Sequence, residues 1–153
     1  MSPSTNNKKR LFIIDGYATL YRAHYALIRN PLTTTAGMPT SAIFGFANQV
    51  FQLLEEENPD YIVAAFDPKG KNFRHELYTD YKANRSAMPD EIQIQLPYLW
   101  ELLDGMNIPV LRIEGVEADD VIGSLAKKFK SKFEISILSG DKDFTQLVDE
   151  KVN

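Results

Sequence analysis

The chain has 153 residues, no cysteine and a formal net charge of −4. This length predicts one domain with a substantial core, and the lack of cysteine excludes disulfides and thiolate metal sites. No apolar run approaches the ~20 residues of a membrane span, so we expect no membrane association. Residues 1–10 are polar without a signal core, which predicts a flexible tail on a cytoplasmic protein. The negative charge argues against a globally basic nucleic-acid binder but allows local basic patches.

Apolar segments and helix-forming segments alternate along the rest of the chain, residues 11–153, which we predict to be one folded core. Predicted strands lie at residues 11–14, 61–66, 110–113 and 133–138, of which the first and third are expected to be buried, and a fifth strand begins at 151–153. Helices are predicted at about 17–28, 41–58, 90–105, 118–130 and 142–147.

Two of these helices have clear apolar faces. The face of the helix after Ser41 is formed by Ile43, Phe46, Ala47, Val50, Phe51 and Leu54. The face of the helix after Pro89 is formed by Ile92, Leu96, Leu99 and Leu103. We expect Pro97 to kink this second helix, because proline cannot donate the backbone hydrogen bond.

Strands that alternate with helices indicate a three-layer α/β fold, with a mostly parallel central sheet and helices on both faces. In such folds, ligands bind beyond the carboxyl ends of the strands. Carboxylates follow every predicted strand: Asp15 the first, Asp67 the second, Glu117, Asp119 and Asp120 the third, and Asp141 and Asp143 the fourth. The sequence therefore predicts seven carboxylates at one edge of the sheet.

The acidic stretch Glu117, Asp119 and Asp120 lies between two apolar segments rather than in a solvated run. A helix N-terminus favours one carboxylate but does not account for three. The alternative is that each aspartate is only a turn or cap residue. Oxygen-only ligands favour Mg²⁺ or Mn²⁺, and up to two such ions, ~3.5–4 Å apart, would serve phosphodiester hydrolysis.

Residues 68–89 have no apolar period and are rich in cations and aromatic residues. They contain Lys69, Lys71, Phe73, Arg74, Tyr78, Tyr81, Lys82 and Arg85. Such a segment suits phosphates and unstacked bases, and its length is unusual for a loop in a compact domain. We expect it to lie over the metal site and to be mobile without DNA, the alternative being a solvated loop.

Several short motifs together carry a resemblance that spans residues 11 to about 148. They include Ile14-Asp15-Gly16, Leu20-Tyr21-Arg22-Ala23, Ala65-Phe66-Asp67, Phe73-Arg74-His75-Glu76-Leu77-Tyr78, Tyr81-Lys82-Ala83-Asn84-Arg85, Gly115-Val116-Glu117-Ala118-Asp119-Asp120-Val121-Ile122-Gly123 and Gly140-Asp141-Lys142-Asp143. The chain resembles the N-terminal five-prime nuclease domains of bacterial DNA polymerase I, which belong to the flap endonuclease family. The resemblance implies a PIN-like, resolvase-like core with residues 68–89 as its arch.

The implied activity is that of a metal-dependent 5′-3′ exonuclease or flap endonuclease in replication and repair, at the bacterial nucleoid. The implied partners are DNA with a 5′ flap or nick, RNA–DNA primer junctions and, if the natural chain is longer, a polymerase domain. All seven carboxylates align with family metal ligands or the residues that support them. Asp15, Asp67 and Asp119 would form the catalytic centre with Lys82 and Arg85, which would steady the phosphate. DNA contacts are implied for Arg22, Lys69, Arg74, Tyr78, Tyr81, Lys82 and Arg85.

Three other classes of protein share parts of this pattern. A haloacid-dehalogenase-type phosphatase would need its nucleophile at position 13, which is Ile13, and a P-loop would need glycine at position 65, which is Ala65. The third alternative is a truncated module that binds metal or DNA without cutting. It remains open because the family domain continues for roughly as many residues again, including a helix-three-turn-helix and further aspartates.

Overall fold

The computed structural model describes residues 8–69, 87–148 and 152. Its centre is a parallel sheet of four strands in the order β3-β2-β1-β4. The strands are β1 (Arg10–Asp15), β2 (Tyr61–Ala65), β3 (Val110–Leu111) and β4 (Glu134–Leu138). The central strand β1 pairs with β2 from Leu11↔Tyr61 to Asp15↔Ala65, and with β4 on its other side. All four strands therefore end at the same edge.

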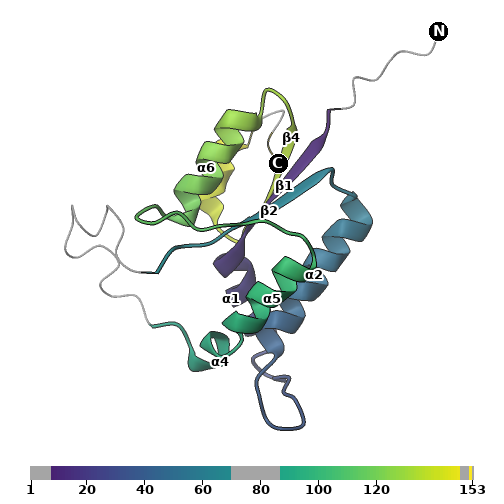
Figure 1. The fold of residues 1–153 in the computed structure, drawn as a ribbon, viewed down its shortest axis with the longest axis vertical. Coiled ribbons are helices and arrows are strands. Elements are labelled where there is room, and N and C mark those ends of the chain that lie inside the picture. Colours follow the sequence, from purple (N-terminus) through teal and green to yellow (C-terminus); the bar gives the residue numbers. More distant parts are fainter. Residues whose placement is uncertain (1–7, 70–86, 149–151, 153) are drawn as a thin grey trace.

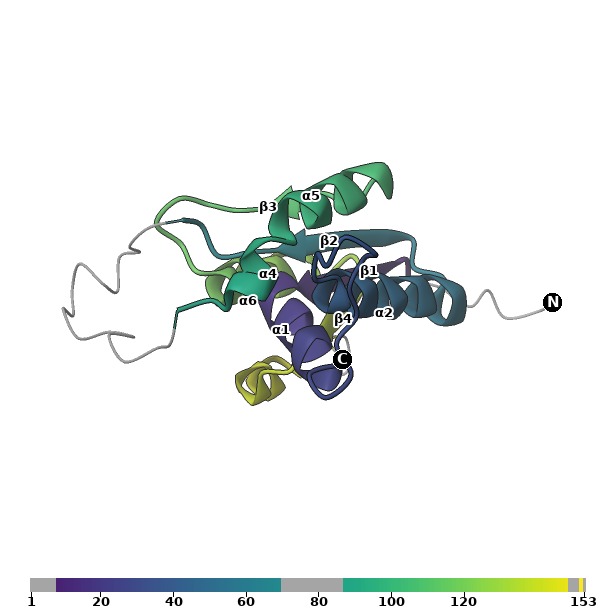
Figure 2. The same ribbon diagram turned by 90° about the horizontal axis from the view of Figure 1, so that it is seen from below.

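Helices cover both faces of this sheet, as Figure 1 shows. One face carries α1 (Gly16–Ala26), α2 (Ser41–Glu57), α4 (Asp90–Gln93) and α5 (Leu96–Gly105), and the other carries α6 (Ala118–Phe129) and the 3-10 helix η1 (Lys142–Leu147). Figure 2 shows β3 and α5 on one side of the molecule and the yellow η1 on the opposite side. Within the described residues, no helix combines the length and apolarity needed to cross a bilayer.

The core forms because β1 is buried on both faces. Ile14 packs with Leu20 and Phe46 against the α1–α2 layer, whereas Leu11 and Ile13 pack against the α6 layer. This alternation is the two-residue period of a strand. The three-layer fold with a parallel sheet is thus confirmed.

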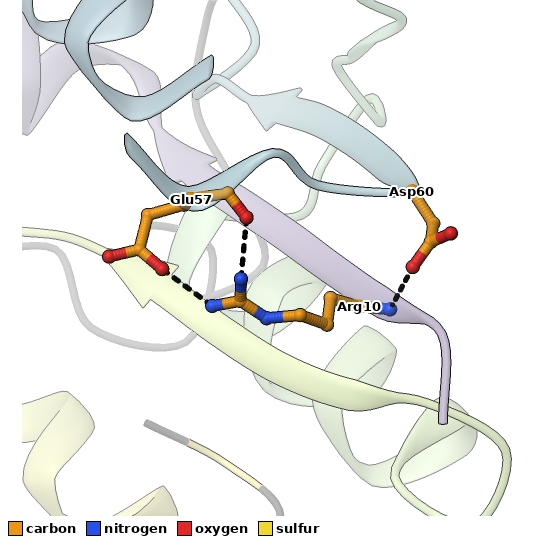
Figure 3. A network of polar contacts seen from close by, with 3 residues as sticks. All are labelled: Arg10, Glu57 and Asp60. Atoms are coloured by element: carbon orange, nitrogen blue, oxygen red, sulfur yellow. Dashed lines mark hydrogen bonds and ion pairs between the residues drawn. The ribbon is translucent and has the colours of Figure 1, made fainter. Parts of the chain in front are cut away.

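Charged groups fasten the amino end of the sheet. The Arg10 guanidinium donates to the Glu57 carbonyl at 2.5 Å and to Glu57 Oε2 at 2.6 Å, and the Arg10 backbone N–H donates to Asp60 Oδ2 at 2.7 Å (Figure 3). The sequence predicts Arg10 to be part of the tail, but it is the first residue of β1. Its pairing with Glu134 of β4 places it in the sheet.

Two predictions of burial were wrong. Phe51 is 50% exposed, because the buried face of α2 runs through Ala42, Phe46, Val50 and Leu53 instead. Ile113 is 48% exposed, because β3 is only two residues long and the chain leaves the sheet after Leu111.

The predicted kink at Pro97 is a complete break between α4 and α5. Proline lies in the first turn of α5, where its missing N–H costs no helical hydrogen bond. Gln95 fills the break: it is fully buried, accepts from the Ile43 N–H at 2.9 Å and donates to the Glu91 carbonyl at 2.6 Å. The fifth strand is represented by Val152, which forms an isolated parallel bridge with Ile135.

Candidate functional site

The carboxyl edge of the sheet gathers residues from all its strands. Asp15 ends β1, Asp67 follows β2, and Asp141 follows β4. Gly16 allows α1 to begin directly after Asp15, since a Cβ at this position would lie 2.2 Å from the Phe66 ring. The tight turn therefore holds Asp15 at the strand end.

Asp15 is one of the buried carboxylates of this edge, at 6% exposure. Burial raises the pKa of its carboxyl. Hydrogen bonds from the Ser139 hydroxyl, at 2.7 Å, and from the backbone of Ala18 lower the pKa in part, and the charges of Asp67 and Asp141 raise it again. Asp15 is thus a buried acid with two donors and two like charges beside it.

Ser139 links the ends of β1 and β4. Its hydroxyl donates to Asp15 Oδ2 and accepts from the Asp141 N–H at 3.0 Å. Asp141 in turn caps η1, because its Oδ1 accepts from the Asp143 N–H at 2.9 Å. The alternative that each aspartate is only a turn or cap residue therefore holds for one oxygen of Asp141. The cap does not use the second oxygen of this carboxylate.

Asp67 connects the end of β2 to the start of α6. Its Oδ1 accepts from the Ala118 N–H at 2.8 Å, which satisfies one of the free donors in the first turn of that helix. Glu117 occupies the N-cap position of α6 and is 4% exposed. Two carboxylates from different strands thus meet at one helix N-terminus.

Asp119 is affected by carboxylates from every strand end of this edge. The residue is exposed, yet the pKa of its carboxyl is raised to about 6, first because neighbouring protein desolvates it. The charges of Asp15, Asp141, Asp67 and Glu117 add to this shift, in that order. We call Asp15, Asp67, Glu117, Asp119 and Asp141 the acidic cluster. A bound cation would favour the ionised form of every member.

Asp120 and Asp143 lie to one side of the acidic cluster. With Asp119 they line an open hollow of about 560 Å³, together with Lys127 and Phe144. The assignment of Asp120 and Asp143 as metal ligands stays a prediction.

The donor chemistry of the acidic cluster fits a hard divalent cation, because every donor is a carboxylate oxygen. In the part of the chain that the structure describes, however, no three acidic or histidine side chains are close enough to hold a metal ion together. Asp67 and Asp141 each give an oxygen to a helix N-terminus. Side-chain rotation would be needed to bring the oxygens around one ion.

The predicted DNA contacts are only partly placed. Arg22 is exposed and lines an open hollow of about 620 Å³ beside Asp141, and Lys69 is exposed two residues after Asp67. The other predicted contacts of the arch lie outside the described residues: Arg74, Tyr78, Tyr81, Lys82 and Arg85. The predicted mobility of residues 68–89 likewise falls mostly on residues outside the described part.

Sequence reasoning missed two residues at this edge. Ser139 directly follows β4, so the rule that singled out the aspartates applies to it as well. Tyr17 follows β1 by two residues; burial raises the pKa of its hydroxyl, an effect that the charge of Arg112 lowers and that of Asp67 raises. Neither residue is a carboxylate, which is the residue type that the metal hypothesis selects.

Comparison with known proteins gives consistent results. Residues 10–153 match the family model described as the 5′-3′ exonuclease, N-terminal resolvase-like domain. The chain is 49% identical over 144 residues to DNA polymerase I of Caldicellulosiruptor bescii, covering 94% of this chain and 17% of that protein. It is 46% identical over 145 residues to a 5′-3′ exonuclease of Aquifex aeolicus, and this match covers 94% of this chain and 50% of that protein. The chain thus spans half or less of these relatives.

Solved structures share the fold at low sequence identity. T5 5′-exonuclease with bound divalent zinc ions has a TM-score of 0.67 at 20% identity, over 94% of this chain and 54% of that one. The bacteriophage T5 flap endonuclease in a pseudo-enzyme-product complex with DNA and metal ions has a TM-score of 0.62 at 21% identity, over 94% and 53%.

Proposed function

We propose a nuclease function on the premise that this chain belongs to the 5′-3′ exonuclease family, as its N-terminal resolvase-like domain. The proposed reaction is the metal-dependent hydrolysis of phosphodiester bonds, as a 5′-3′ exonuclease or a flap endonuclease. The observation that carries this proposal is the convergence of the five carboxylates of the acidic cluster at the carboxyl edge of the parallel sheet, where four of them raise the pKa of the fifth, Asp119, beyond the effect of its burial. Such a concentration of like charge at the carboxyl edge of a parallel sheet is costly without a cation.

The acidic cluster would hold the first ion, and Asp120 and Asp143 would help with a second. Either Mg²⁺ or Mn²⁺ would supply an activated water and stabilisation of the leaving oxygen when bound. Ser139 and the Ala118 N–H keep Asp15 and Asp67 oriented at the strand ends. The metal ions bound in the T5 structures support a divalent cation.

The proposed substrate is DNA with a 5′ flap or nick, including RNA–DNA primer junctions. The T5 flap endonuclease complex with DNA supports the choice of nucleic acid. Lys82 and Arg85 would steady the scissile phosphate and Tyr81 would stack on a base, while Arg22 and Lys69 would contact the backbone. Because relatives named DNA polymerase I match over 17% of their length, a polymerase domain in the same protein and work at the bacterial nucleoid are part of the proposal.

A cleavage assay tests this function. The chain is incubated with a 5′-labelled flap substrate in Mn²⁺, Mg²⁺ or EDTA, beside the variant Asp119→Asn. Short labelled products are expected with Mn²⁺ and Mg²⁺, none with EDTA and few with the variant. Binding of the flap without any cleavage in either metal would favour the module that binds without cutting.

A further inference from the structure

Arg112 lies on the same edge of the sheet as the acidic cluster. It directly follows β3, whose last residue, Leu111, accepts a hydrogen bond at 2.9 Å from the backbone N–H of Phe66. Phe66 immediately precedes Asp67 in the chain. The β2–β3 pairing therefore places Arg112 beside a member of the acidic cluster.

Aromatic side chains fix the position of this arginine. The Arg112 guanidinium carbon lies 4.5 Å from the centroid of the Trp100 ring. Trp100 packs edge-on against Phe66 at 4.7 Å, and Phe66 packs edge-on against Tyr17 at 5.0 Å. The charge of Arg112 also lowers the pKa of the Tyr17 hydroxyl, so the two side chains lie near each other. The stack on Trp100 gives Arg112 a support that a flexible surface arginine lacks.

The positive charge of Arg112 is accessible from solvent. The residue is exposed, and within residues 8–69, 87–148 and 152 it forms no ion pair with a carboxylate. A guanidinium that stacks on an aromatic ring with its flat face keeps free the N–H donors around its edge. These donors match the geometry of a phosphate. Arginine stacked on tryptophan is therefore ready to bind a phosphate without losing much side-chain freedom.

We propose that Arg112, held on Trp100, binds a backbone phosphate of the DNA strand that passes the acidic cluster. This inference rests on the proposed function, because it takes DNA as the ligand. The acidic cluster repels a polyanion, and a fixed cation beside it offsets that repulsion and sets where the strand lies. The competing explanation is structural: Arg112 only pins the segment after β3 to α5.

The experiment measures the affinity of the intact chain for flap DNA by fluorescence anisotropy, without metal, between 50 and 200 mM KCl. The variants are Arg112→Ala, Arg112→Lys and Trp100→Phe, with Lys132→Ala as a matched control. Lys132 is an exposed cation two residues before β4, at the opposite end of the sheet. Thermal midpoints of all variants are recorded beside the affinities.

Arg112→Ala should weaken binding about 5- to 20-fold and make the slope of log affinity against log salt shallower by about one phosphate. Arg112→Lys should keep the slope and lose part of the affinity, because lysine keeps the charge but not the planar stack. Trp100→Phe should have nearly the affinity and salt slope of the original chain, because phenylalanine still offers an aromatic ring. Lys132→Ala should have the same affinity and slope as the original chain.

Unchanged affinity and salt slope in Arg112→Ala, with or without a lower thermal midpoint, would overturn the phosphate assignment in favour of the structural explanation. If Arg112→Ala does not fold, Arg112→Lys and Arg112→Gln decide, since an unaltered slope in the glutamine variant contradicts the proposal. If the chain binds flap DNA but never cleaves it, only the proposed nuclease function is contradicted. If it binds no DNA at all, the nuclease function and the phosphate contact of Arg112 are both contradicted.

Discussion

The two ends of the sheet use charge in opposite ways. At the amino end, the Arg10 guanidinium pairs with the Glu57 carboxylate, while the Arg10 backbone N–H donates to Asp60 (Figure 3). At the carboxyl end, burial and the charges of four other carboxylates raise the pKa of Asp119 to about 6. The amino end is arranged for stability. The carboxyl end instead concentrates like charge, and perturbed carboxylates of this kind are often found at functional sites.

The largest difference between the two ends should appear in cleavage. Asp119→Asn should lower the rate of flap cleavage by about 100-fold or more, because even residues that only support metal ligands cost 10–100-fold. Asp60→Asn at the amino end is the matched control and should cleave like the original chain. Product formation with a labelled flap in Mn²⁺ gives both rates. Equal losses in the two variants would remove the functional distinction between the ends.

Divalent metal should stabilise the protein through the carboxyl end alone. A cation that binds only the folded state stabilises by about 2.7 kcal/mol at a hundredfold excess over Kd. Thermal melts in EDTA, Mg²⁺ and Mn²⁺ should show a higher midpoint with metal, and Asp119→Asn or Asp141→Asn should abolish the increase. In EDTA the same variants should melt higher than the original chain, since they remove like charge. Lower midpoints in EDTA would identify these aspartates as structural caps.

Removing the charge of Arg10 should have the opposite effect on stability. Arg10→Ala loses the ion pair with Glu57, whose two side chains are partly exposed, so we expect a loss of about 1–2 kcal/mol in the free energy of unfolding. Denaturant titration measures this loss. Cleavage per folded molecule should not change, and a loss of cleavage greater than the loss of folded protein would contradict a purely structural role.

The smallest effect should be a pH dependence of the metal-free protein. The folded chain binds the Asp119 proton more tightly than the unfolded chain, since the pKa rises from 3.8 to about 6. The favourable contribution is therefore complete below pH ~3.8 and is lost as pH rises through about 6. Because the residue is exposed and screened by solvent, we expect only about 1 kcal/mol between these limits.

Denaturant titrations in EDTA at several pH values between 4 and 7 measure this dependence. Asp119→Asn should flatten it, whereas Asp60→Asn should leave it in place. A metal-free stability that increases over this range equally in the original chain and in Asp119→Asn would show that other groups dominate, and that the acidic cluster is not strained.

The sequence predicts correctly the features that depend on residues close together in the chain, namely the strands and helices and their order. Apolar runs predicted all four strands, and the alternation with helices predicted their parallel order at one shared edge. That edge follows from topology alone, so the sequence is enough to group Asp15, Asp67, Asp119 and Asp141. The motifs added the family, which the match over residues 10–153 confirms.

Other features depended on contacts between distant segments, and only the tertiary structure decided them. The rotation of α2 buries Leu53 and exposes Phe51, and the short β3 leaves Ile113 in solvent, because packing partners rather than periodicity set these positions. The Asp67 bond to Ala118 spans 51 residues, and the Asp15 bond to Ser139 spans 124. The stack of Arg112 on Trp100 likewise joins a strand end to a helix. Sequence spacing determines which side chains reach the edge of the sheet, whereas their partners there are determined by how separate elements pack in three dimensions.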